Sequence, residues 1–332
     1  MRRYRWRLIL LLVVSGGIMP AGNSRGQDTN VSERIYFSAL NKEEKPVMGL
    51  KPADFELRID GKPAPLVSFH PALSPGDRSI PYAVLILLSF GPTMKSKVIE
   101  QQANAAAGLF QMLNPASVVG IRMVSDRSET LAPLAHDPPA LKNALLQYEQ
   151  RRAELNVGLK KDEAVVGNAG MVRALEFAVD EIDDYIASQP SLRDREVRRA
   201  IMVISGADLN PGYTLKILYE KAAHAGVFLY PVYYPIGMYG PFVMDYFQLA
   251  KKTAGVASVF GALKPGSEVL PLPRSNLNPN ALTANFLHMI RDVNGKYSFT
   301  VAPAPPGRSV RLELKCKVKG VRILMPHTNL EK

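Results

Sequence analysis

The stretch Tyr82-Ala-Val-Leu-Ile-Leu-Leu-Ser89-Phe-Gly-Pro-Thr93 decides the fold of this chain of 332 residues. Its Ala83–Leu88 part is apolar at every position, which is typical of a strand buried on both faces of a sheet. Four more apolar runs follow: Val118–Val124, Arg199–Ser205, Val227–Tyr233 and Ala257–Phe260. Segments with helical patterns lie between and after them: Lys97–Leu113, Pro139–Glu154, Gly170–Ser188, Thr214–Ala225, Tyr246–Thr253 and Ala281–Arg291. This alternation predicts an α/β domain at residues 80–293 with a doubly wound, mostly parallel sheet.

The regions on either side of this domain have a different pattern. Residues 27–75 and 294–326 alternate between apolar and polar positions, as strands with one buried face do. Asp60-Gly61 is a strong hairpin signal within the first region. Each region alone supplies too few strands for a core of its own. We therefore expect the two regions to pair into one small all-β domain, into which the α/β domain is inserted.

The N-terminal residues 1–26 are predicted to be a secretory signal peptide. Four arginines precede the short apolar run Leu8–Val14, and small residues follow it. A membrane anchor is the alternative, but the run is short for a span of about 20 residues. Removal of residues 1–26 would take five arginines and lower the formal net charge from +11 to +6. We expect an exported protein, periplasmic or secreted, from a Gram-negative bacterium, with no stable membrane insertion after cleavage.

The remaining charges give no sign of a nucleic-acid partner, because no basic stripe with interleaved aromatic residues is present. The mixed run Arg193–Arg199 and the acidic run Asp180–Asp184 are interpreted as solvated surface. Cys316 is the single cysteine, so no internal disulfide is expected. Its place in an alternating strand favours a small inward-facing core residue over a reactive thiol.

Several segments together resemble the VWFA-related exported proteins of the acidobacterial type. The most specific of them is Asp54-Phe-Glu-Leu57 followed by Asp60-Gly-Lys-Pro63. The segments Thr130–Asp137, Leu249–Gly255 and Tyr297–Pro303 also fit in order and spacing. The resemblance implies a von Willebrand factor A-like (vWA-like) fold over nearly the whole mature chain.

The metal-ion-dependent adhesion site of that family does not carry over to this chain. Where the family has Asp-x-Ser-x-Ser, this chain has Ser89 at the Asp position and Gly91 and Thr93 at the two Ser positions. Ala169 stands at the position of the bridging Thr, and Ser205 at that of the second Asp. Because Mg²⁺ requires anionic oxygen ligands to offset its dehydration, we expect no metal at this site. Asp208 and Asn210 are offset from the ligand position and are interpreted as caps of a turn or of the next helix.

The sequence gives little support for a zinc site, a catalytic nucleophile or an anion-binding loop. The five histidines are scattered and have no zinc-site spacing, and no nucleophile elbow is present. A serine nucleophile at Ser89 or Ser205 is conceivable but has no placed histidine partner. The loop Gly167–Gly170, which includes Asn168, resembles a helix entry more than an anion site. We therefore expect no catalytic residue and no cofactor.

An aromatic loop follows the run Val227–Tyr233. It contains Tyr234, Tyr239 and Phe242 among prolines and glycines, and it is either a partner-binding surface or a satellite of the core. Our hypothesis is an exported, non-enzymatic, adhesion-like module for protein–protein interaction. Its contacts would come from loops of what we term the former metal face: Ser89, Gly91, Thr93, Asn168, Ala169, Ser205, Asp208, Asn210, Tyr234, Tyr239 and Phe242. The alternative is a cell-envelope scaffold or assembly subunit in which the β domain makes the contacts. The protein partner is unknown in either case.

Overall fold

The computed structural model describes residues 33–43, 45–89, 110–124, 128–156, 169–193, 195–205, 215–233, 243–259, 280–302, 310–326 and 329–330. No helix in these ranges is both long enough and apolar enough to cross a membrane. The predicted signal peptide lies outside the described residues.

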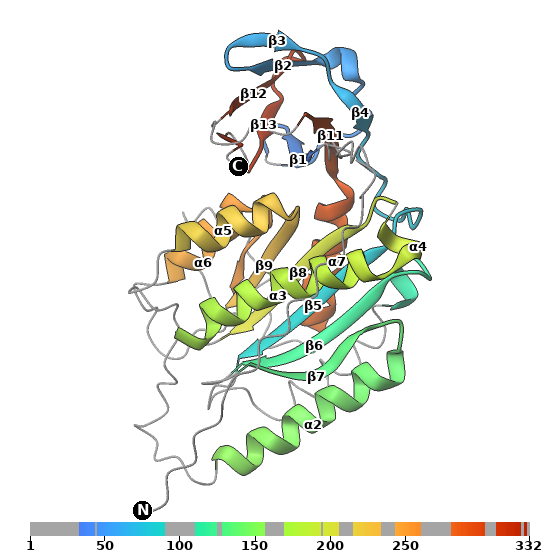
Figure 1. Cartoon of the computed structure of the whole chain (residues 1–332), viewed down its shortest axis with the longest axis vertical. Coiled ribbons are helices and arrows are strands. Elements are labelled where there is room, and N and C mark those ends of the chain that lie inside the picture. Colours follow the sequence, from blue (N-terminus) through green and yellow to red (C-terminus); the bar gives the residue numbers. More distant parts are fainter. Residues whose placement is uncertain are drawn as a thin grey trace, which may run out of the picture. The chain divides into compact units, whose positions relative to one another are not determined.

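A six-stranded sheet forms the centre of the α/β part (Figure 1). Its strands are β5 (Tyr82–Ser89), β6 (Val118–Val124), β7 (Ser128–Ala135), β8 (Arg198–Ser205), β9 (Val227–Tyr233) and β10 (Ser258–Val259). Their order is β10-β9-β8-β5-β6-β7, and every pair is parallel except β6 with β7. The order reverses at β5, as in a doubly wound sheet, and this confirms the predicted mostly parallel α/β arrangement.

Helices cover both faces of this sheet because its central strands are apolar at every position. Val84, Ile86 and Leu88 of β5 share a core with α2 (Pro138–Asn156), α7 (Asn280–Asn294) and the 3-10 turn η2 (Phe110–Met112). Their neighbours Ala83, Leu85 and Leu87 pack on the other face. The helices there are α3 (Ala169–Ser188), α4 (Pro190–Arg193), α5 (Leu215–His224) and α6 (Val243–Lys252). Full burial of each large apolar side chain stabilises the fold by roughly 1.5–3 kcal/mol.

Strands from the two ends of the described chain pair with each other. They are β1 (Glu33–Leu40), β2 (Phe55–Ile59), β3 (Lys62–Ala64), β4 (Val67–His70), β11 (Lys296–Val301), β12 (Val310–Cys316), β13 (Arg322–Leu324) and β14 (Asn329–Leu330), with a 3-10 turn η1 (Pro52–Asp54) before β2. They form two four-stranded antiparallel sheets, β13-β1-β11-β4 and β14-β12-β2-β3. A shared aromatic core of Phe37, Phe55, Phe69 and Tyr297 has ring centroids 5.2–5.8 Å apart. The side chain of Cys316 is partly buried against the same core.

Two local signals in the sequence correspond to the backbone that they predict. Asp60 and Gly61 have φ angles of 51° and 78° and connect β2 to β3, as a two-residue hairpin turn requires. Gly226, the second residue after α5, has a φ of 64°, and a glycine at this position commonly ends a helix.

One segment differs from expectation, and another is described only at its end. β7 was not predicted, because its sequence Ser128–Ala135 carries polar residues and Pro133. Proline is tolerated there because β7 is an edge strand of the sheet. The predicted helix Lys97–Leu113 lies mostly outside the described residues, and its described end is the short turn η2.

Candidate functional site

β5 and β8 are adjacent parallel strands at the centre of the sheet, so their carboxyl ends lie side by side along the edge where the parallel strands end. Leu88 is the register partner of Ile204, so the next positions, Ser89 and Ser205, are neighbours at the ends of adjacent parallel strands. Ligands of doubly wound sheets bind at this edge, beside the reversal of strand order. The side chain of Ser205 is buried, with 1% of its surface exposed. At these two strand ends the chain therefore places neutral hydroxyl residues and no carboxylate.

The structure places only part of the predicted former metal face. Ser89 and Ser205 end their strands, and Ala169 is the first residue of α3. The predicted positions Gly91, Thr93, Asn168, Asp208, Asn210, Tyr234, Tyr239 and Phe242 lie outside the described residues. Within the described ranges, no group of three or more His, Cys, Asp or Glu residues is placed to hold a metal ion.

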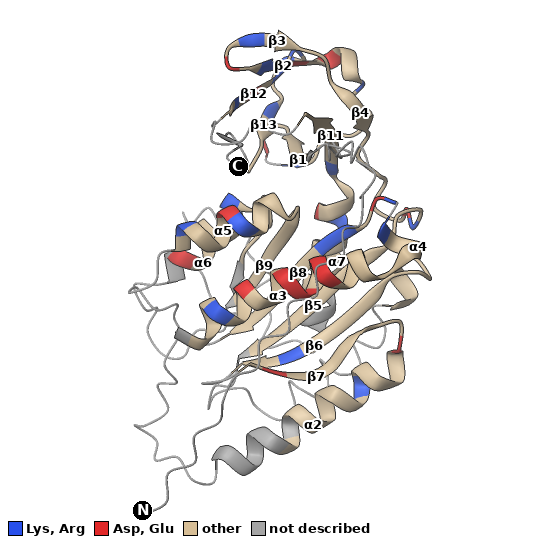
Figure 2. Ribbon diagram, in the orientation of Figure 1, with Lys and Arg blue, Asp and Glu red and all other residues tan. Residues whose placement is uncertain are grey.

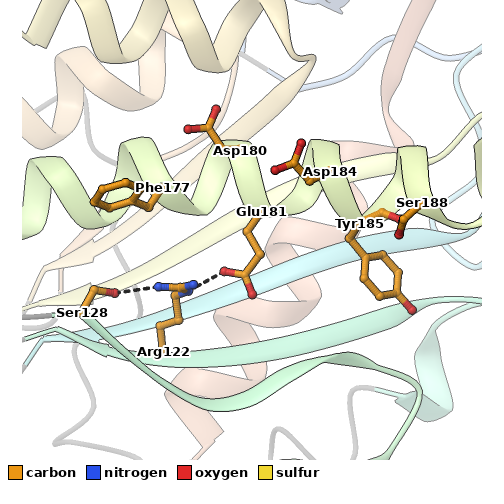
Figure 3. Close-up of a pocket in the computed structure, with 8 residues that line it drawn as sticks. All are labelled: Arg122, Ser128, Phe177, Asp180, Glu181, Asp184, Tyr185 and Ser188. Carbon is orange, nitrogen blue, oxygen red and sulfur yellow. Dashed lines mark hydrogen bonds and ion pairs between the residues drawn. The ribbon is translucent and has the colours of Figure 1, made fainter. Parts of the chain in front are cut away.

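A surface groove of about 770 Å³ lies between α3 and the strands β6 and β7 (Figure 3). β6 is apolar except for Arg122, whose half-buried guanidinium forms an ion pair with Glu181 of α3. Arg122 Nη1 also donates a hydrogen bond of 3.1 Å to Ser128 Oγ. The two contacts fix the guanidinium at the floor of the groove. Its lining is Arg122, Ser128, Phe177, Asp180, Glu181, Asp184, Tyr185 and Ser188.

The acidic run on α3 is only partly the solvated surface that was predicted. Asp180, Asp183 and Asp184 are exposed, whereas Glu181 is half-buried beside Arg122. Figure 2 shows acidic residues gathered along the middle of α3, opposite a basic position on β6. Arg122 is the signal that was missed, because a single arginine in an otherwise apolar strand needs a partner.

The interpretation of Arg193–Arg199 as a solvated run is wrong for its second half. The Glu196 side chain is 7% exposed and forms ion pairs with Arg34 at 2.9 Å and Arg198 at 3.2 Å. Its carboxylate also lies 2.9 Å from His70 Nδ1. Arg198 is completely buried, with its guanidinium carbon 5.2 Å from the centre of the Tyr36 ring. The cluster joins strands β1 and β4 to β8, a contact that the local sequence does not reveal.

A second buried ion pair lies at the end of α7. Lys296 Nζ, on a side chain only 1% exposed, is 2.7 Å from the Asp292 carboxylate and donates a 3.1 Å hydrogen bond to Ser38 Oγ. Tyr230 donates its hydroxyl hydrogen to the same carboxylate. Tyr82 likewise donates to the side-chain oxygen of Asn294. These contacts connect α7 with β1, β5 and β9, so we assign them to the fold.

Burial of tyrosines near these ion pairs predicts a loss of stability at alkaline pH. Burial raises the pKa of Tyr36, Tyr82 and Tyr230 above the ordinary value of 10.0, and the Asp292 carboxylate raises that of Tyr230 further. The unfolded chain thus loses tyrosine protons first. The stabilisation is complete below about pH 10 and is lost as the pH rises toward the folded pKa values.

We therefore expect the urea concentration at the midpoint of unfolding to decrease as the pH is raised from 9 to 11.5. The decrease should be smaller in a Tyr230→Phe variant. Equal midpoints for the parent chain at these two pH values would contradict the assignment.

No protein-family model matches the chain, and no curated protein sequence matches it. Solved structures give distant matches. A von Willebrand factor type A protein from Catenulispora acidiphila is 11% identical with a TM-score of 0.44, over 91% of this chain and 75% of that one. BatB from Bacteroides thetaiotaomicron is 16% identical with a TM-score of 0.40, over 63% and 98%. The N-terminal domain of TFIIH p34 is 16% identical with a TM-score of 0.46, over 63% and 97%.

Proposed function

We propose that this chain is an exported, non-enzymatic, adhesion-like module for protein–protein interaction, with a vWA-like domain that has lost its metal site. One observation carries the proposal. Ser89 and Ser205 stand side by side at the carboxyl ends of the central strands, where the related site requires two carboxylates. Two neutral hydroxyl residues supply no charge to offset the dehydration of Mg²⁺. Binding at this face is therefore metal-independent.

In the proposed organisation, the contacts with the partner protein lie on loops that the α/β domain holds in place. The α/β domain is inserted in an all-β domain made of the N-terminal and C-terminal strands, in agreement with the pairing of β1 with β11 and β2 with β12. The former metal face lies at the carboxyl ends of the strands, and its loops include the aromatic residues Tyr234, Tyr239 and Phe242. Aromatic side chains on a rigid support are the residue types that contribute most to protein interfaces.

The scaffold alternative is favoured by a different observation. Val67, Met48 and Val318, which lie in or beside the β sheets, expose 53%, 39% and 39% of their surface. If the β domain makes the contacts, these residues belong to the interface, and the α/β domain is a spacer.

A capture experiment separates the two functions. The full mature chain is immobilised, exposed to an envelope extract of the source cells, and compared with two variants. One carries Tyr234→Ala, Tyr239→Ala and Phe242→Ala. The other carries Val67→Ser and Val318→Ser. We expect a captured partner whose amount is unchanged by EDTA and falls at least about tenfold with the loop variant, equivalent to about 1.4 kcal/mol.

The matched β-domain variant should capture as much partner as the parent chain. Loss of capture with this variant alone would show that the scaffold function is correct. Loss of capture in EDTA would contradict the metal-independent interaction.

A further inference from the structure

The positive charge of the chain is concentrated in the segments that form the β sheets. Residues 27–75 and 294–326 contain 13 Lys and Arg against 8 Asp and Glu, an excess of 5 positive charges. Residues 76–293 contain 22 against 21, an excess of 1. The densest part is residues 310–322, with five basic residues and one acidic residue. In Figure 2, basic positions recur on β2, β12 and β13.

The chain turns back between β12 and β13 through an ordered backbone turn. The N–H of Val321 donates to the carbonyl oxygen of Val318 at 3.3 Å, and Gly320 has a φ of 81°. A glycine with positive φ at the third of four positions is typical of a type II turn. Just before the turn, the N–H of Lys317 donates to the carbonyl oxygen of Asp54 at 2.8 Å. The side chains of residues 317–320, which we term the basic turn, are therefore presented on a fixed backbone.

Four lysines gather at the basic turn. Lys315, Lys317 and Lys319 are exposed. Lys42, which follows β1, is also exposed and reaches the same place, because a Cβ at Gly320 would lie 3.9 Å from its Cε. Within the described ranges, none of these four lysines forms an ion pair. Their charges are therefore available to an anionic partner.

The carboxylates on neighbouring elements already have partners. Glu56 of β2, the strand beside β12, pairs with Arg58 at 2.7 Å. Glu43 pairs with Lys45 at 2.8 Å. The carboxylate of Asp54 accepts a hydrogen bond of 2.7 Å from the backbone N–H that precedes η1. The four lysines therefore keep an excess of positive charge at this end of the β sheets.

An exposed apolar side chain lies among the lysines. Val318 exposes 39% of its surface and is flanked in sequence by Lys317 and Lys319. The surface of an anionic lipid bilayer matches this combination, because it has phosphate groups outside and an apolar layer beneath them. A single carboxylate of a protein partner is matched better by the planar fork of Arg than by the mobile point charge of Lys. The residue types at the turn therefore favour a lipid surface over an acidic polypeptide.

We propose that the basic turn, with Lys42 and Lys315 beside it, binds the surface of a membrane that contains anionic phospholipid. The lysine ammonium groups contact the headgroup phosphates, and Val318 enters the boundary between the headgroups and the acyl chains. Binding of this kind is peripheral and places no helix in the bilayer. The inference goes beyond the proposed protein–protein interaction and does not rest on it.

The test is co-sedimentation of the full mature chain with lipid vesicles at about 50 mM and about 300 mM salt. Vesicles of phosphatidylcholine with phosphatidylglycerol are the anionic probe, and vesicles of phosphatidylcholine alone are the neutral probe. Lys317→Gln with Lys319→Gln removes two charges from the basic turn. Lys142→Gln with Lys251→Gln is the matched control, because it removes the same charge from exposed positions on α2 and α6.

We expect the parent chain to bind the anionic vesicles about tenfold or more tightly than the neutral ones, and more weakly at the higher salt concentration. The basic-turn variant should lose about tenfold in affinity for the anionic vesicles, because lysines close to such a surface each contribute to binding. Val318→Ser should lose about twofold and the matched control less than about twofold. Thermal unfolding of each variant verifies that it is folded.

Two results would overturn the inference. One is an equal loss of affinity in the basic-turn variant and the matched control. The other is equal binding of the parent chain to anionic and neutral vesicles. A fluorescein-labelled peptide of alternating serine and glutamate tests the acidic-protein alternative by fluorescence anisotropy. If the parent chain binds this peptide and not the anionic vesicles, and the basic-turn variant loses the peptide, the partner is an acidic protein and the lipid inference is wrong.

Failure of this inference is distinguishable from failure of the proposed function. If the basic-turn variant retains vesicle binding while the aromatic-loop variant loses partner capture, the lipid inference fails and the interaction function stands. If EDTA abolishes partner capture while the parent chain still selects anionic vesicles through the basic turn, the metal-independent function fails and the lipid inference stands.

Discussion

Glu196→Ala is expected to lower the free energy of unfolding by about 3–5 kcal/mol, because it leaves the guanidinium of Arg198 buried without its carboxylate partner. Arg198 has no exposed surface, and its Nη1 donates long hydrogen bonds to the backbone carbonyl oxygens of Val293 at 3.5 Å and Lys296 at 3.4 Å. These long contacts are weak substitutes for an ion pair. The same substitution removes the partner of Arg34 and thus loosens β1 from β8.

Urea denaturation followed by circular dichroism measures this loss. Glu313→Ala is the control, because Glu313 pairs with Arg311 on an exposed strand face and should cost less than about 1 kcal/mol. A double variant, Glu196→Gln with Arg198→Met, should recover much of the stability, since it also removes the buried cation that Glu196→Ala leaves without a carboxylate partner. A cost below 1 kcal/mol for Glu196→Ala would show that the cluster is solvated.

Gly255→Ala is expected to cost about 3 kcal/mol or more, or to prevent folding. A Cβ at this position would overlap the carbonyl oxygen of Leu229 and lie 2.8 Å from its carbonyl carbon. Leu229 belongs to β9 between two other strands, so its backbone cannot move without displacing the sheet. Strain of this kind is more costly than crowding of a flexible side chain.

Gly76→Ala is the matched control for this second prediction. Nothing lies within 4 Å of a Cβ at Gly76, so its substitution should change stability by less than about 0.5 kcal/mol. Thermal unfolding of both variants gives the comparison. Equal stabilities would mean that α6 and β9 are farther apart in solution than described.

Much of the α/β architecture was predictable, because apolar runs such as Ala83–Leu88 and Val227–Tyr233 have few alternatives to a buried strand. The edge strand β7 was not, because an edge tolerates polar residues and Pro133. At the end of α6 the residue with positive φ is Ala254, at 56°, and not the glycine that follows it. Gly255 is instead required by its close approach to Leu229.

The charged residues were harder to interpret than the apolar ones. Glu196 and Arg198 lie in a run that also carries exposed charges, and their burial depends on strands β1 and β4 that are distant in the sequence. Arg122 and Glu181 are likewise separated by 59 positions. At the former metal face, the replacement of the ligand residues stays a prediction of the resemblance, and the register of β5 and β8 shows Ser89 and Ser205 to be neighbours.

Thermal unfolding of the full mature chain, in EDTA and in millimolar Mg²⁺, Mn²⁺ or Ca²⁺, tests the central claim most directly. A ligand that binds only the folded state must raise the midpoint. We predict the same midpoint in EDTA and in each metal, because the proposed function puts Ser89, Ala169 and Ser205 at the positions where the related site has its metal-holding residues. A saturable rise with Mg²⁺ or Mn²⁺, absent with EDTA, would contradict the account and make metal-dependent adhesion the leading function.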